Sequence, residues 1–397
     1  GGRGRWEARV RGLAEGGHKV IACASRTIEE QGWAGDEPGA GYAFAGLLVC
    51  EDAVRPGVAD AVRQCRESGI HTLMVTGDHP ETARAVARAI GLGEGDPQVI
   101  LGEDLEAGIR AGRDFRGVDV IARAVPSQKL DLVRALQARR EIVAVTGDGV
   151  NDVPALQAAD VGIAMGGRGT RSAREVASIV LLDDNFASIV GAIAEGRQLF
   201  RNLRRSYQYL LVVHLGLVLT ATLIPLAGFP LLYLPIHIVW LESVIHPTAM
   251  LAFQELPTRR GLEPADARDG TRFFSRREWA LIVAVGLVLT GAVVFGYTRG
   301  LATGVEHARS MAMAMLTIAS AALAALLSRL RTAAARFVCA ATIALSVLLI
   351  QIPAVAALVH VEPLHLDDWV IATAGGLAAV SLHALAHFAR RRRGATA

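Results

Sequence analysis

The chain contains 397 residues, with 41 basic and 38 acidic side chains, a formal net charge of +3 and a mean hydropathy of +0.36. Hydrophobic residues make up 52% of it, which excludes a disordered chain, and the small net charge argues against nucleic acid as the main partner. The four cysteines form no C-x-x-C pair, which argues against a disulfide framework or a thiolate metal site. The positive hydropathy indicates a lipid bilayer as a partner.

Up to about residue 205 the chain carries charge throughout and alternates short apolar runs with amphipathic ones. The apolar runs predict strands over 20–24, 44–49, 72–76, 118–122, 142–146 and 161–164. The amphipathic runs predict helices over 56–68, 80–90, 127–137, 153–158 and 170–176. This alternation predicts an α/β fold with a mostly parallel sheet and helices on both faces. Ligands of such sheets gather at the carboxyl ends of the strands.

The third predicted strand ends in Thr76-Gly77-Asp78, and Pro80 is placed to begin a helix. A hydroxyl group and free backbone N–H groups at a helix N-terminus can bind an anion such as phosphate. The simpler interpretation is that these residues only cap the helix.

The fourth predicted strand is followed by Arg123 and Lys129. Lys129 and Lys19 are the two lysines among the 41 basic residues, the others being arginines. A compact ammonium group suits contact with phosphate. Chance retention of a lysine on a surface helix explains Lys129 equally well.

The fifth predicted strand leads into Thr146-Gly-Asp-Gly-Val-Asn-Asp152, in which the carboxylates of Asp148 and Asp152 flank Asn151. If a helix begins here, the two carboxylates converge on one point, as a hard cation such as Mg²⁺ requires. A solvated acidic turn is the weaker alternative, because such a turn seldom follows a run of apolar strand residues.

Six stretches after Arg205 are long and apolar enough to cross a membrane. They lie at about 206–227, 231–254, 279–298, 310–328, 337–359 and 369–389. The cations that flank them are concentrated on one side, which predicts that the polar half and the C-terminus are cytoplasmic. These cations include Arg201, Arg204, Arg205, Arg259, Arg260, Arg268, Arg272, Arg276, Arg277, Arg329, Arg331, Arg336 and Arg390–Arg393.

Glu242 is the only acidic residue within these six stretches, and ionisable groups at bilayer depth are candidates for function. His246 lies one helical turn after Glu242, and Pro247 breaks the backbone ladder beside it. With His214 they form a candidate site for a transported ion. An interhelical hydrogen bond is an equally good explanation for each histidine. The residues leave H⁺, Ca²⁺ and a borderline metal such as Mn²⁺ open.

The ordered set Thr76-Gly77-Asp78, Lys129 and Asp148…Asp152 resembles the later motifs of the haloacid-dehalogenase superfamily. The longer strings "LLVCEDAVRPGVADAVRQCRESGIHTLMVTGDHPETARAVARAIGL", "IARAVPSQKLDLV" and "VAVTGDGVNDVPALQAADVGIAMG" resemble the phosphorylation domain of P-type cation-transporting ATPases. The resemblance implies ATP and Mg²⁺ as cofactors. It also implies an α/β haloacid-dehalogenase-like cytoplasmic domain followed by a bundle of six transmembrane helices in the plasma membrane.

The resemblance also assigns roles residue by residue. Thr76 and Gly77 would hold the transferred phosphoryl group, Lys129 would neutralise it, and Asn151 would touch phosphate. Asp148 would bind Mg²⁺, and Asp152 would orient Lys129 and the metal shell. Asp78 and Arg123 would face the nucleotide, with Asp52 and Arg55 at the hinge.

The chain also departs from the family. It lacks the family's Asp-Lys-Thr-Gly-Thr nucleophile, so we expect an N-terminal part of the same pump to supply it. The expected domains are a remnant of the nucleotide-binding domain (1–35), the phosphorylation domain (36–190) and the membrane domain (191–397). The carboxylates of calcium-moving members are replaced by Leu217 and Val244. The alternative function is an inactive membrane protein that binds nucleotide or phosphate without turnover.

Overall fold

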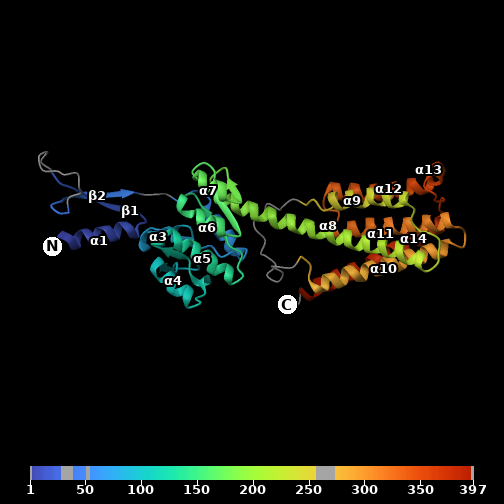
Figure 1. The fold of residues 1–397 in the computed structure, drawn as a ribbon, viewed down its shortest axis with the longest axis horizontal. Helices are drawn as coiled ribbons and strands as arrows, with labels where there is room; N and C mark the ends of the chain where they lie inside the picture. Colours follow the sequence, from blue (N-terminus) through green and yellow to red (C-terminus); the bar gives the residue numbers. More distant parts are fainter. Residues whose placement is uncertain (1, 28–38, 51–53, 256–272, 395–397) are drawn as a thin grey trace. The chain divides into compact units, whose positions relative to one another are not determined.

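The computed structural model describes residues 2–27, 39–50, 54–255 and 273–394, which form two compact units with a boundary between Ala194 and Glu195 (Figure 1). The first unit mixes strands and helices, and the second is helical. Some residues with predicted roles lie outside the described ranges: Asp52, Arg259, Arg260, Arg268 and Arg272.

The first unit begins with helix α1 (Gly2–Glu15), followed by an antiparallel pair of strands, β1 (Lys19–Ser25) and β2 (Ala43–Cys50). Both strands were predicted from their apolar runs. Helix α1 was not predicted, because the interior glycines Gly4 and Gly12 weaken its helix propensity.

Six short strands form two parallel sheets of three strands each, in the orders β3-β5-β4 and β6-β7-β8. The strands are β3 (Met74–Val75), β4 (Val99–Leu101), β5 (Val120–Ala122), β6 (Ala144–Gly147), β7 (Val161–Met165) and β8 (Ile179–Leu181). The parallel pairing was predicted, whereas the expectation of one sheet was wrong. In the described residues β3 and β6 are each an edge strand of a separate sheet, because no ladder joins them.

The helices between the strands carry the connections that parallel pairing requires. They are α2 (Val58–Glu67), α3 (Pro80–Ala89), α4 (Gly102–Arg110), α5 (Pro126–Ala138), α6 (Val153–Ala158) and α7 (Arg171–Val176), with single 3₁₀ turns η1 (Phe115–Gly117) and η2 (Val150–Asp152). Helix α4 and strands β4 and β8 were not predicted. The two strands contain three residues each, too few for a period of two to be visible in the sequence.

Strand β5 lies at the centre of the first parallel sheet and is fully buried. Val120 packs with Ala87 of α3, whereas Ile121, which points to the opposite face, packs with Leu105 of α4 and Leu132 of α5. Helices therefore cover both faces of this sheet, as predicted, and its strand ends stay open for loops.

The second unit consists of helices, most of them long and apolar. They are α8 (Ala187–Leu226), which begins before the boundary, α9 (Pro235–Leu251), α10 (Arg276–Gly300), α11 (Val305–Ser328), α12 (Ala333–Gln351), α13 (Pro353–Leu358) and α14 (Leu366–Gly394). Among these described helices of the second unit, α8, α10, α11, α12 and α14 are long and apolar enough to cross a bilayer. The chain is therefore a multi-pass membrane protein.

The second predicted span, 231–254, corresponds to helix α9, which has only 17 residues. Proline lacks an N–H group and is favoured at the first helical position, so Pro235 sets the start of α9. The prediction of six spans thus holds for five helices by length and composition, and α9 is shorter than the span expected there.

Helix α11 is the most buried of the long helices and packs against α10, α12 and α14. Met311, Met313 and Met315 are at most 1% exposed there, so they serve packing. Close approach to α10 depends on glycine, because a Cβ atom at Gly300 would lie 2.7 Å from Cα of Ala308.

Candidate functional site

The loop after β3 holds Thr76 in a fixed orientation. Its Oγ1 donates to Oδ2 of Asp78 over 2.9 Å and accepts from the Asp78 amide over 3.1 Å. The N-cap of α3 is His79, whose Nδ1 accepts from the Glu81 amide. Because the capping side chain belongs to His79, the explanation of Thr76-Gly77-Asp78 as a mere helix cap does not hold.

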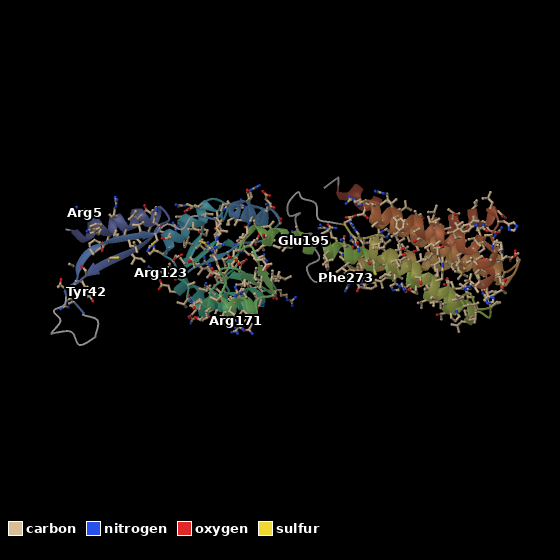
Figure 2. The ribbon with its side chains drawn as sticks, turned by 90° about the horizontal axis from the view of Figure 1, so that it is seen from above. Arg5, Tyr42, Arg123, Arg171, Glu195 and Phe273 are labelled. Atoms are coloured by element: carbon tan, nitrogen blue, oxygen red, sulfur yellow. The ribbon has the colours of Figure 1, made fainter. Side chains whose placement is uncertain are left out.

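The loop after β5 is hydrogen bonded to the loop after β3. The Ala124 amide donates to the Thr76 carbonyl over 2.9 Å, and the Arg123 amide donates to the Asp78 carbonyl over 3.1 Å. Arg123, exposed on the first unit (Figure 2), has a φ of 56°, a backbone conformation that costs energy for a residue with a side chain. Two strand ends thus form one connected rim, and strain of this kind occurs often at functional sites.

Helix α5 brings Lys129 to the loop after β6. Lys129 Nζ donates to Oδ1 of Asp152 over 2.6 Å, and the two side chains are 24% and 14% exposed. The other Asp152 oxygen, Oδ2, accepts from the Gly149 amide over 3.3 Å. The ion pair fixes the position of the Lys129 ammonium group at the loop after β6.

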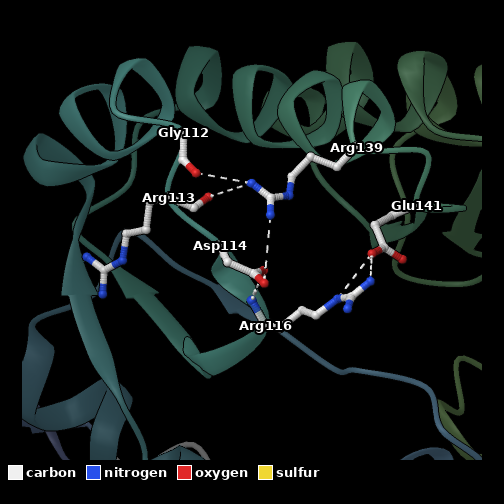
Figure 3. A network of polar contacts seen from close by, with 6 residues as sticks. All are labelled: Gly112, Arg113, Asp114, Arg116, Arg139 and Glu141. Atoms are coloured by element: carbon white, nitrogen blue, oxygen red, sulfur yellow. Dashed lines mark hydrogen bonds and ion pairs between the residues drawn. The ribbon is translucent and has the colours of Figure 1, made fainter.

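A network at the C-terminal end of α5 fixes the helix against the loop after α4 (Figure 3). Arg139 donates to the carbonyl groups of Gly112 and Arg113 over 3.1 and 3.4 Å, and lies 3.7 Å from the Asp114 carboxylate. These contacts are exposed, so each contributes at most about 1 kcal/mol. Their effect is to orient the helix that carries Lys129.

The loop after β6 approaches Asp152 closely. A Cβ atom at Gly147 would lie 2.6 Å from Cβ of Asp152, so only glycine fits there without displacing the carboxylate. The Asp148 carbonyl accepts from the Thr170 amide over 2.8 Å, and the residues Asp148 and Asn151 are exposed. Within the part of the chain that the structure describes, the Asp148 carboxylate has no hydrogen-bond or ion-pair partner and is available to a ligand.

The structure therefore joins Lys129 to Asp152 and Thr76 to Asp78, whereas Asp148 contacts neither pair directly in the described residues. Gly77 lies beside the loop after β5, since a Cβ atom there would be 3.7 Å from the Ala124 carbonyl oxygen.

Sequence reasoning gave no role to two acidic residues that support these loops. Asp160 Oδ2 accepts from the Val143 amide over 2.8 Å, which lowers the pKa of Asp160 and fixes the entry to β6. Burial raises the pKa of Asp184, but the amides of Gly167 and Arg168 donate to its carboxylate and the net shift is downward. Asp160 directly precedes strand β7, and this position was the available signal, whereas Asp184 lies three residues after β8 and gave none. Arg55 donates to the Asp184 carbonyl over 2.8 Å.

The membrane unit contains a second cluster, formed by His214 of α8 and by Glu242 and His246 of α9. His214 Nε2 lies 3.3 Å from Oε1 of Glu242, and His246 Nδ1 lies 2.7 Å from Oε2 of the same carboxylate. One potential ligand atom from each residue lies within 4.8 Å of the other two. Sequence periodicity predicted the pair on α9, and the structure adds the contact to His214.

Comparisons with known proteins match both units. A family model described as haloacid dehalogenase-like hydrolase matches residues 9–160, a second of the same description matches 129–193, and a model described as "Cation transporting ATPase, C-terminus" matches 230–389. The chain is 42% identical over 259 residues to "Cation-transporting ATPase pma1" of Synechocystis sp., covering 64% of this chain and 29% of that protein.

Two further relatives carry different ions in their names. The "Calcium-transporting ATPase" of Bacillus subtilis is 35% identical over 326 residues, which cover 79% of this chain and 36% of that protein. The "Potassium-transporting ATPase alpha chain 2" of Rattus norvegicus is 37% identical over 250 residues, which cover 55% and 24%. The chain spans about a quarter to a third of the length of these relatives, and their names do not agree on one ion.

Proposed function

We propose that this chain, which belongs to the P-type cation-transporting ATPases, is part of a pump that uses ATP hydrolysis to move a cation across a membrane. The observation that carries the proposal is the Lys129–Asp152 ion pair at the loop after β6, in a chain whose described residues include five apolar helices of membrane-crossing length. Phosphoryl transfer needs groups that position the phosphate and stabilise the charge on its oxygens.

The chain's own residues fit that requirement. The Thr76 hydroxyl and the Gly77 amide would hold the phosphoryl group, and the Lys129 ammonium, oriented by Asp152, would offset its negative charge. Asp78 and Arg123 flank the same rim and would face the ATP. Asn151 lies exposed beside Asp148, where its amide can contact a phosphate oxygen.

The donors in the loop after β6 also fit Mg²⁺, because they are oxygen atoms and the Asp148 carboxylate has no competing partner among the described residues. Asp148 would hold the ion directly. Both oxygens of Asp152 already accept hydrogen bonds, so Asp152 would complete the metal shell and fix Lys129. When bound, Mg²⁺ would neutralise phosphate charge.

The nucleophile must come from another part of the same pump, since the sequence contains no Asp-Lys-Thr-Gly-Thr. Strands β3 and β6, which carry the Thr76 and Asp148 loops, each present an unpaired edge in the described residues. Such edges can pair with a further strand. The pump would lie in the plasma membrane, and the bias of arginines toward one side favours a cytoplasmic first unit and C-terminus. The transported cation would pass His214, Glu242 and His246.

The test compares Asp148→Asn with Asp60→Asn in the full-length protein. Asp60 is 72% exposed on α2 and serves as the matched control. Phosphoenzyme formed from radiolabelled ATP in the presence of Mg²⁺ is measured after acid quenching. We expect Asp148→Asn to lower its rate by at least about 10²-fold and Asp60→Asn to leave it unchanged. Normal phosphorylation of Asp148→Asn refutes the proposal, and a wild-type protein that binds ATP but never becomes phosphorylated supports the binding-only alternative.

A further inference from the structure

The membrane cluster offers two imidazoles and one carboxylate to a single point. His214 and Glu242 come from different helices, and His246 lies one turn after Glu242 on the same face of α9. The two imidazole rings lie 5.8 Å apart in an edge-to-face arrangement, with the carboxylate in contact with both. Packing of α8 on α9 therefore produces a preformed group of three ligands.

A hydrogen bond on the far side of the His214 ring indicates which ring nitrogen faces the carboxylate with a lone pair. Nδ1 of His214 lies 2.9 Å from the Leu210 carbonyl oxygen, and a carbonyl only accepts, so Nδ1 carries a proton. In the neutral imidazole Nε2 then presents a lone pair to the Glu242 oxygen 3.3 Å away. Two electron pairs that face each other repel, and either a proton on Nε2 or a bound cation removes that repulsion. A histidine that donates its other N–H group to a backbone carbonyl is also the usual arrangement of a metal ligand.

The second histidine contacts the other oxygen of the same carboxylate. The buried Oε2 atom of Glu242 lies 2.7 Å from His246 Nδ1, and the same nitrogen lies 3.3 Å from the Glu242 carbonyl oxygen. When the proton of the neutral His246 ring is on Nε2, Nδ1 presents its lone pair beside Oε2, so the two atoms can share a bound cation.

The ligand types select a class of cation. Ca²⁺ takes six to eight oxygen ligands, but this site has one carboxylate, and the nearby Leu217 and Val244 are buried and apolar. Imidazole nitrogen suits divalent transition metals, and two histidines with one glutamate form a known zinc-binding set that leaves a coordination position open. A soft monovalent ion such as Cu⁺ prefers thiolate ligands. The cluster contains no cysteine, since the buried Cys339 belongs to α12, so a soft monovalent ion is disfavoured.

We infer that His214, Glu242 and His246 bind a divalent transition-metal cation of the Zn²⁺, Co²⁺ or Mn²⁺ class as the cargo of the pump. This inference rests on the proposed pump function and adds the class of its substrate. Pro247 leaves the Ser243 carbonyl without its helical donor, which supplies a further oxygen on the same helix.

The experiment measures metal binding to the purified full-length protein without ATP. Co²⁺ is the spectroscopic probe, because nitrogen ligation changes its visible absorption, and Zn²⁺, Mn²⁺ and Ca²⁺ are compared by equilibrium dialysis. With Mg²⁺ in excess to fill the Asp148 loop, we expect one site for the transition metals that survives excess Ca²⁺. Glu242→Gln, His214→Ala and His246→Ala should each weaken it by about 10- to 100-fold. The exposed residues His71 and Glu306 provide the controls His71→Ala and Glu306→Gln, which should bind as the wild type does.

Several results would overturn the inference. One is equal metal binding by all variants, and another is Ca²⁺ binding that is lost with Glu242→Gln. A third is ATP hydrolysis that depends on pH through Glu242 and on no metal other than Mg²⁺, which would indicate a transported proton. Failure of the proposed function is recognised separately. Asp148→Asn should still bind Co²⁺ with the wild-type spectrum, so metal binding together with an unaltered phosphoenzyme in that variant would refute the pump while the metal site stands.

Discussion

Replacement of Gly147 by alanine should disable phosphorylation by displacing Asp152. The added Cβ atom would lie 2.6 Å from Cβ and 2.8 Å from Oδ2 of Asp152. Carbon atoms in contact keep about 3.5 Å apart or more, so the Asp152 side chain must move by about 1 Å. The 2.6 Å contact from Lys129 Nζ would then exceed hydrogen-bonding distance, and Lys129 would lose its orientation.

A misplacement of about 1 Å costs roughly 10²-fold in rate, or about 2.7 kcal/mol in the activation free energy. The assay is the rate of phosphoenzyme formation from radiolabelled ATP in the full-length protein. Gly149→Ala is the matched control in the same loop, because its Cβ atom would lie 3.6 Å from Asp152 Oδ2 and its φ of −98° suits any residue. It should stay within about twofold of the wild type. Wild-type rates for Gly147→Ala, or an equal loss in Gly149→Ala, would refute the reasoning.

Two further predictions concern stability. Gly300→Ala should destabilise the membrane unit by about 1–3 kcal/mol, because its Cβ atom would lie 2.7 Å from Cα of Ala308, whereas Gly291→Ala meets nothing within 4 Å. Thermal unfolding in detergent measures both, and equal melting temperatures would contradict the close contact. The Val143 amide lowers the folded-state pKa of Asp160 below the ordinary value of 3.8. The stability that the Asp160 carboxylate contributes is therefore fully present above pH 3.8 and is lost as the pH falls through the folded-state pKa. Asp160→Asn should weaken this acid-dependent loss in melts recorded from about pH 6 to pH 3, and an unchanged acid dependence would count against it.

The sequence predicted most of the first unit because its signals are local. Strands β1, β2, β5, β6 and β7 have apolar runs bounded by turn residues, and α3 and α5 begin at prolines. The prediction of a single parallel sheet was wrong for the described residues. Strand pairing depends on which segments lie side by side in space, and neither the β3 nor the β6 sequence shows that each is an edge.

The candidate site shows the same limit at the level of side chains. The motif order identified Lys129 and Asp152 separately, but their contact joins residues 23 positions apart and depends on how α5 packs on α6. On α9 the spacing of Glu242 and His246 follows from helical periodicity alone. His214 belongs to another helix, so its contact with Glu242 could be found only from the packing of α8 and α9.

The two cation sites proposed for this chain have different ligand chemistry, and this difference would let one protein keep two metals apart. The loop of Asp148 offers oxygen atoms, which suit Mg²⁺ and give a transition metal no imidazole to bind. The cluster around Glu242 offers nitrogen atoms that Mg²⁺ gains little from. A pump that must hold Mg²⁺ while it moves a competing divalent ion needs this separation. We therefore expect excess cargo metal to inhibit phosphorylation by displacing Mg²⁺ from Asp148. Raising the Mg²⁺ concentration should relieve that inhibition without displacing metal from His214 and His246.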